Sequence, residues 1–92
     1  MNQVHPHHID VVIVTTSGVY PATGADQLPI NQPVRVQLAR AAANLGITDT
    51  AGWIARVGGV EIDANRSYEE NSLDGSITID YGPREGGGGC TS

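Results

Sequence analysis

The chain has 92 residues, which is enough for one domain and too few for two. Its net charge is −5, and its five cationic side chains are all arginines that do not form a cluster. An acidic chain without a basic cluster is unlike proteins that bind nucleic acid or an anionic membrane. The single cysteine, Cys90, excludes an internal disulfide and an iron–sulfur cluster, and it suits a reducing cytoplasm.

Residues 1–8 are expected to form a flexible arm ahead of the domain. They hold His5, His7 and His8 but no basic region followed by an apolar run, so they do not resemble a signal peptide. No second cluster of ligating residues accompanies these histidines, and we predict no metal site. The longest apolar stretch, 11–14, is too short to cross a membrane, so we expect a soluble, cytoplasmic monomer.

The first predicted strand covers residues 8–17. Its side chains at 9, 11, 13 and 15 fall on one face, and this alternation is typical of a strand with one buried face. Ser17-Gly18 supplies a turn. A weaker second strand is expected from Val19, with an interruption at Pro21 and a continuation over residues 26–30.

The clearest helix is predicted between Asn31, a good N-cap, and Gly46, which fits the position just past the end. Pro33 fits the first turn. An apolar face recurs at helical spacing and consists of Val34, Leu38, Ala41, Ala42 and Leu45. The opposite face is predicted to be polar and to present Arg35, Gln37, Arg40 and Asn44.

The remaining elements are short. Strands are predicted over 53–57 and 60–62, joined by a turn at Gly58-Gly59, with Trp53 packed where the helix meets the sheet. Ser67 is expected to cap a short helical turn over 68–73, with Glu69 and Glu70 near its start. A last alternating strand is predicted over 76–81, with Ile77, Ile79 and Tyr81 facing one way, after which Pro83 leaves the sheet.

This order of elements predicts an α+β fold in which a mixed sheet of four to five strands packs on one helix. The first and last strands would lie parallel and adjacent in the centre, which is the β-grasp topology. The predicted organisation is an arm over 1–8, a domain over 9–82 and a flexible glycine-rich tail over 83–92.

Residues 55–73, with the sequence ARVGGVEIDANRSYEENSL, resemble the same region of ubiquitin in element order and spacing. A strand and a glycine tail follow in both. More narrowly, the whole chain resembles the bacterial ubiquitin-like modifiers found beside activating-enzyme, conjugating-enzyme and deubiquitinase-like partners. The resemblance covers residues 8–89 and implies the ubiquitin-like β-grasp fold.

The resemblance also implies a function for the tail, Gly86, Gly87, Gly88 and Gly89. A partner activating enzyme would adenylate the terminal glycine carboxylate with ATP, and an enzyme thiolate would capture it for transfer to a target protein by a conjugating enzyme. Glycines suit this task because backbone without Cβ atoms fits a narrow cleft. Cys90 begins a short extension that a protease would remove after Gly89, or after Gly87 or Gly88. The protein itself would be neither an enzyme nor the holder of a cofactor.

Ubiquitin is recognised through an apolar patch on its sheet, and the matching positions here are Arg56, Thr78 and Asp80. These residues are polar, so we expect dedicated partners that recognise charge, with Arg56 and Asp80 able to pair across neighbouring strands. Arg84 would help to direct the tail away from the sheet and contribute to recognition.

Three alternatives remain open at this stage. A sulfur carrier would use the same adenylation to make a C-terminal thiocarboxylate, and a non-conjugating β-grasp binding module would not use the tail. A Gly-Gly-Gly-Gly-Cys sequence also suits a linker that ends in a labelling thiol. The absence of lysine reflects either an arginine-rich codon bias or protection from self-modification, and it confines any polymer to linkage through the N-terminus or a hydroxyl.

Overall fold

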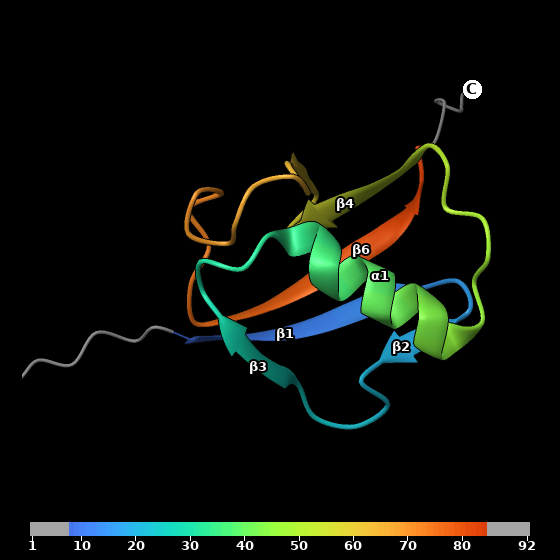
Figure 1. Ribbon diagram of the computed structural model, residues 1–92, viewed down its shortest axis with the longest axis horizontal. Coiled ribbons are helices and arrows are strands. Elements are labelled where there is room, and N and C mark those ends of the chain that lie inside the picture. The colour runs from blue at the N-terminus through green and yellow to red at the C-terminus, as the bar shows by residue number, and fades with distance from the viewer. Residues whose placement is uncertain (1–7, 85–92) are drawn as a thin grey trace, which may run out of the picture.

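Strands β1 (His8–Thr15) and β6 (Ser76–Pro83) lie parallel and adjacent at the centre of the sheet in the computed structural model, which describes residues 8–84. Strand β2 (Gly18–Tyr20) flanks β1, while β4 (Trp53–Val57) and β5 (Val60–Ile62) follow on the other side of β6 (Figure 1). This arrangement confirms the predicted β-grasp topology.

The sheet has six strands where four to five were predicted, because the interrupted second strand forms two separate strands. β2 pairs with the end of β1, from Ile13 to Thr15. β3 (Asp26–Pro29) pairs with the beginning of β1, from His8 to Val11. The prediction of an interruption near Pro21 is therefore confirmed.

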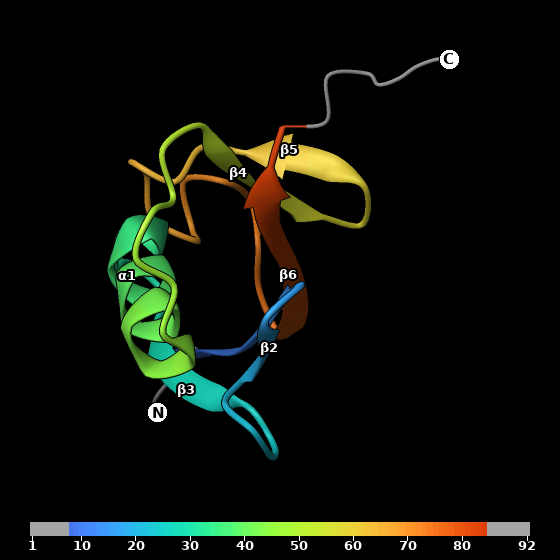
Figure 2. The same ribbon diagram turned by 90° about the vertical axis from the view of Figure 1, so that its right-hand side faces the viewer.

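Helix α1 (Val34–Leu45) lies across one face of the sheet (Figure 2). Its end at Gly46, in the left-handed conformation with φ 74°, is as predicted. The predicted N-cap is wrong, because the capping position is Pro33 and not Asn31. The distant loop 64–66 replaces a side-chain cap: the Val34 amide donates to the Arg66 carbonyl at 3.0 Å and the Arg35 amide to the Ala64 carbonyl at 2.8 Å.

The core lies between α1 and the sheet face that it covers. The sheet contributes Ile9, Val11, Ile13 and Ile79, all at most 1% exposed. Gln37 was predicted on the polar face of the helix, but it is fully buried. Its side-chain amide donates to the Asp26 carboxylate of β3 at 2.6 Å, and this bond allows a polar group to be buried at the junction of helix and strand.

The segment after β5 forms a hydrogen-bonded turn and not a helix. Ser67 caps it as predicted, since the Glu70 amide donates to the Ser67 hydroxyl and the Ser67 amide donates to the Glu70 carboxylate, both at 3.0 Å. Asn71 closes the turn by donating its side-chain amide to the carbonyls of Asp63 and Ser67. This turn holds the loop that caps α1.

Strand β6 extends two residues beyond the predicted end at Tyr81, and Pro83 does not leave the sheet. Pro83 pairs with Trp53 of β4. β1 and β6 pair only as far as Val14 and Asp80, so the end of β6 is locally an edge, where a residue without an amide proton is tolerated. Strand pairing thus extends one residue beyond each end of the predicted 9–82 domain.

Trp53 lies where α1 meets the sheet, as predicted, and is half-buried. Its ring packs edge-to-face on that of Tyr81, with 5.0 Å between the ring centroids. Within residues 8–84, no helix has both the length and the apolar character needed to cross a membrane.

Candidate functional site

The sheet face opposite α1 carries the predicted recognition residues. Strand pairing places Val14 of β1 opposite Asp80 of β6, Asp80 opposite Arg56 of β4, and Arg56 opposite Glu61 of β5. Directly opposed residues share a face of the sheet, so these four form one row across four strands. Thr78 lies two residues before Asp80 on the same face and is exposed. We call this row, with Thr78, the charged row.

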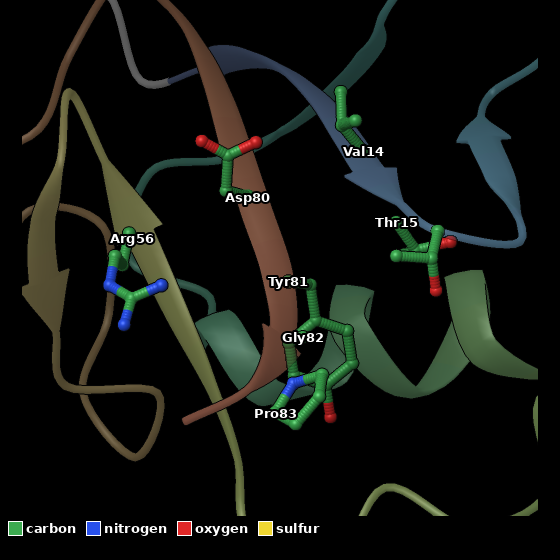
Figure 3. A pocket seen from close by; sticks show the side chains of 8 residues that line it. Val14, Thr15, Arg56, Asp80, Tyr81, Gly82 and Pro83 are labelled. Carbon is green, nitrogen blue, oxygen red and sulfur yellow. The ribbon is translucent and has the colours of Figure 1, made fainter. Parts of the chain in front are cut away.

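The charged row contains two opposed charges that do not pair. Arg56 and Asp80 are direct neighbours in strand register, yet no ion pair joins them within residues 8–84. Their side chains point in opposite directions along the two strands (Figure 3). The expected Arg56–Asp80 contact is therefore absent, and both charges remain accessible to a partner.

A groove of about 350 Å³ runs beside Arg56 and Asp80 toward the end of β6 (Figure 3). Val14 and Thr15 of β1 form one side of the groove. Gly82 contributes no side chain, and a Cβ at this position would meet no atom within 4 Å, so the groove stays open where the chain leaves the sheet.

Sequence reasoning missed Val14 and Gly82 as members of this site. A glycine inside a strand has no side chain to pack and can leave open space on the sheet, and this was the available signal for Gly82. Val14 carried no such signal, because its proximity to Asp80 depends on the parallel pairing of the first and last strands.

Arg84 connects the end of β6 to the charged row. One guanidinium nitrogen donates to both carboxylate oxygens of Glu61, at 3.0 and 3.1 Å, and the Arg84 amide donates to the Gly52 carbonyl at 3.4 Å. These contacts hold the last described residue beside β4 and β5. The predicted processing and conjugation residues, Gly86, Gly87, Gly88, Gly89 and Cys90, lie outside the described residues.

No protein-family profile and no curated protein matches the sequence significantly. Solved structures do match. A designed protein based on ubiquitin has a TM-score of 0.67 at 16% identity, covering 92% of this chain and 99% of the other. Caldiarchaeum subterraneum ubiquitin has a TM-score of 0.58 at 14% identity, covering 88% and 99%. The UBL domain of yeast Ddi1 has a TM-score of 0.57 at 20% identity, covering 86% and 94%.

The fold is ubiquitin-like. At these identities the likeness concerns the fold, and any activity has to be argued from the residues of this chain. Its ubiquitin-like sheet has a mostly polar open face, with Arg56 and Asp80 at its centre. Among residues 8–84, no group of three or more His, Cys, Asp or Glu side chains is placed to hold a metal ion, and His5 and His7 lie outside that range.

Proposed function

We propose that this ubiquitin-like protein is a modifier of the bacterial type, conjugated to target molecules through its C-terminal glycines. The observation that carries the proposal is the position of Arg84. Its contacts with Glu61 and Gly52 fix the end of β6, and the glycine run begins two residues further along the chain. A run without side chains that follows an anchored strand end suits entry into a narrow active site.

The proposed chemistry uses the protein as a substrate. A protease hydrolyses the bond after Gly89 and releases the Cys90-Thr91-Ser92 extension. The new carboxylate attacks the α-phosphate of ATP and displaces pyrophosphate, which gives an acyl adenylate. A partner thiolate then attacks the acyl carbon and displaces AMP, and the thioester passes the acyl group to an amine or hydroxyl of the target. ATP in the cytoplasm would supply the adenylation step.

Partner recognition is assigned to the charged row, with Arg56 and Asp80 as its central pair. Each lacks an ion-pair partner among residues 8–84, so a partner surface with one carboxylate and one cation in matching positions satisfies both. Such recognition is salt-sensitive, because the groups are accessible to solvent. The absence of lysine leaves the N-terminal amine and hydroxyls as acceptors when the protein is its own target.

The test is intact mass spectrometry of the purified chain after incubation with extract of its native host and ATP. The proposal expects loss of the last three residues, then adducts that form only with hydrolysable ATP. Chains that end at Gly87, Gly88 or Gly89 identify the reactive terminus, because only the correct one is activated without the protease.

Other products would contradict the proposal in defined ways. Replacement of one terminal oxygen by sulfur identifies a sulfur carrier. A chain that stays untrimmed and unmodified under conditions that activate a control modifier identifies a binding module, a role compatible with a fold that also occurs as the UBL domain of yeast Ddi1.

A further inference from the structure

A second hollow, of about 340 Å³, lies between α1 and β4 on the helix-covered side of the sheet. Alanines line it on both sides: Ala39 and Ala42 from α1, Ala55 from β4 and Ala64 from the loop after β5. Their methyl groups are too short to fill the space between helix and strand. We call this hollow the alanine cleft.

One wall of the alanine cleft is aromatic. Trp53 and Tyr81 both line it, and their rings meet edge-to-face at an interplanar angle of 76°. Both residues are half-buried. Neither the indole N–H nor the phenolic hydroxyl has a hydrogen-bond partner within the part of the chain that the structure describes. The wall therefore offers an aromatic surface together with unused polar edges.

The charges around the alanine cleft do not cancel. Glu61 and Asp63 line it, but each carboxylate is paired with an arginine, Glu61 with Arg84 at 3.0 Å and Asp63 with Arg66 at 3.3 Å. Arg35 also lines the cleft, and its guanidinium makes no ion pair or hydrogen bond within residues 8–84. The cleft thus carries one uncompensated positive charge on an otherwise acidic protein, and this charge favours an anionic ligand.

We propose that the alanine cleft binds an aromatic side chain with an adjoining carboxylate, supplied by a partner protein. The ring packs against Trp53 and Tyr81, and the carboxylate pairs with Arg35. The volume is sufficient, since pockets for small ligands begin at about 300 Å³. The partner is the enzyme that handles the tail, because Tyr81 of the cleft wall lies only three residues before Arg84, on the strand that leads into the tail. The choice of this enzyme as the partner rests on the proposed function, whereas the binding of an aromatic side chain with a carboxylate does not.

Trp53 is the only tryptophan of the chain, so its fluorescence reports directly on the cleft. The probes are N-acetylphenylalanine, its uncharged amide, and N-acetylalanine. We expect a saturable change with N-acetylphenylalanine at a Kd of roughly 1–10 mM, as befits a fragment of this size. The amide should bind at least about threefold more weakly, and N-acetylalanine should have no effect. The proposal falls if N-acetylphenylalanine gives no saturation, or if its amide binds equally well.

Matched variants locate the binding. Ala39→Leu fills the cleft from an exposed position of α1 and should weaken binding of N-acetylphenylalanine about tenfold, while Ala43→Leu, on the same helix but outside the cleft, should not. Arg35→Gln should reduce affinity to that of the amide, while Arg56→Gln on the open sheet face should leave it unchanged. Unaltered binding by Ala39→Leu, or equal losses from the two arginine variants, would overturn the proposal.

The identity of the partner is tested separately in the conjugation assay. Ala39→Leu should slow the ATP-dependent transfer at least about threefold relative to Ala43→Leu. Equal rates for these two variants, with the wild-type chain active, would exclude the tail-handling enzyme as the partner. Inactivity of every chain, wild type included, would instead overturn the proposed function and leave the fluorescence result standing.

Discussion

The two faces of the sheet are built from alternate residues of the same strands, yet they have different roles. On β6, Ile79 faces α1 and is fully buried, while its neighbours Thr78 and Asp80 are exposed on the open face. On β1, Val11 and Ile13 are fully buried, while Val12 and Val14 on the open face are only half-buried. The helix-covered face therefore determines the stability of the fold, whereas the open face is free to vary in charge.

The largest expected effect comes from truncating a side chain on the covered face. Ile79→Ala removes a fully buried side chain in contact with the core and should lower the free energy of unfolding by about 2–5 kcal/mol. Thr78→Ala, the adjacent residue on the open face, should change it by less than about 0.5 kcal/mol. Urea unfolding of both variants measures this difference, and similar losses would show that the two faces contribute equally to stability.

The core beneath the covered face also contains a tyrosine, from the turn after β5, whose hydroxyl is buried without a partner among residues 8–84. Burial raises the pKa of Tyr68 from 10.0 to about 12, with smaller opposing contributions from Arg40, which lowers it, and Asp26, which raises it. Between these two pH values the unfolded chain ionises at Tyr68 and the folded chain does not. The free energy of unfolding should therefore fall as pH rises through this window, by roughly 2–3 kcal/mol in all.

Tyr68→Phe should remove that step and, because the hydroxyl has no partner to lose, should leave the neutral-pH stability equal or higher. Tyr81→Phe, which alters a half-buried tyrosine, serves as the control and should retain the step. Urea unfolding from about pH 9 to about pH 12 measures all three chains. An unchanged pH profile in Tyr68→Phe would contradict this account.

A smaller effect on stability is expected at the turn after β5, which holds the loop that caps α1. Ser67→Ala breaks the reciprocal bonds with Glu70 and should lower the free energy of unfolding by about 0.5–2 kcal/mol. Ser67→Thr keeps the hydroxyl and should recover most of this loss. Ser17→Ala, at an exposed serine whose hydroxyl donates no bond within residues 8–84, should be neutral. Equal losses at Ser67 and Ser17 would exclude the cap as the cause.

The smallest effect on stability is expected on the open face. Arg56→Gln removes a charge that makes no ion pair within the described residues and should change the free energy of unfolding by less than about 0.5 kcal/mol. The same change should slow ATP-dependent activation at least about threefold at low salt and less at high salt. Arg40→Gln, at an exposed arginine of α1 that likewise makes no ion pair within the described residues, is the matched control. If Arg56→Gln and the wild type were activated equally, Arg56 would have no role in activation. The two faces would then differ in their contribution to stability alone.

Local patterns in the sequence determined the elements and the identity of the faces. Alternation along residues 8–15 and 76–81 identified the buried side of β1 and β6, because side chains on a strand point alternately to its two faces. Gly46 identified the end of α1, because glycine readily takes the left-handed conformation found there. The capping role of Ser67 was also readable, since the Glu70 amide that donates to its hydroxyl lies within the same turn.

Only the tertiary structure decided the features that join distant segments. The amides at the start of α1 are satisfied by carbonyls of the loop 64–66, and Gln37 can be buried because the Asp26 carboxylate of β3 accepts a hydrogen bond from its side-chain amide. Arg56 and Asp80 share a row but point apart, and the alanine cleft lies between segments that meet only after folding. A local pattern specifies which way a side chain faces, but what it faces depends on packing between elements far apart in the chain.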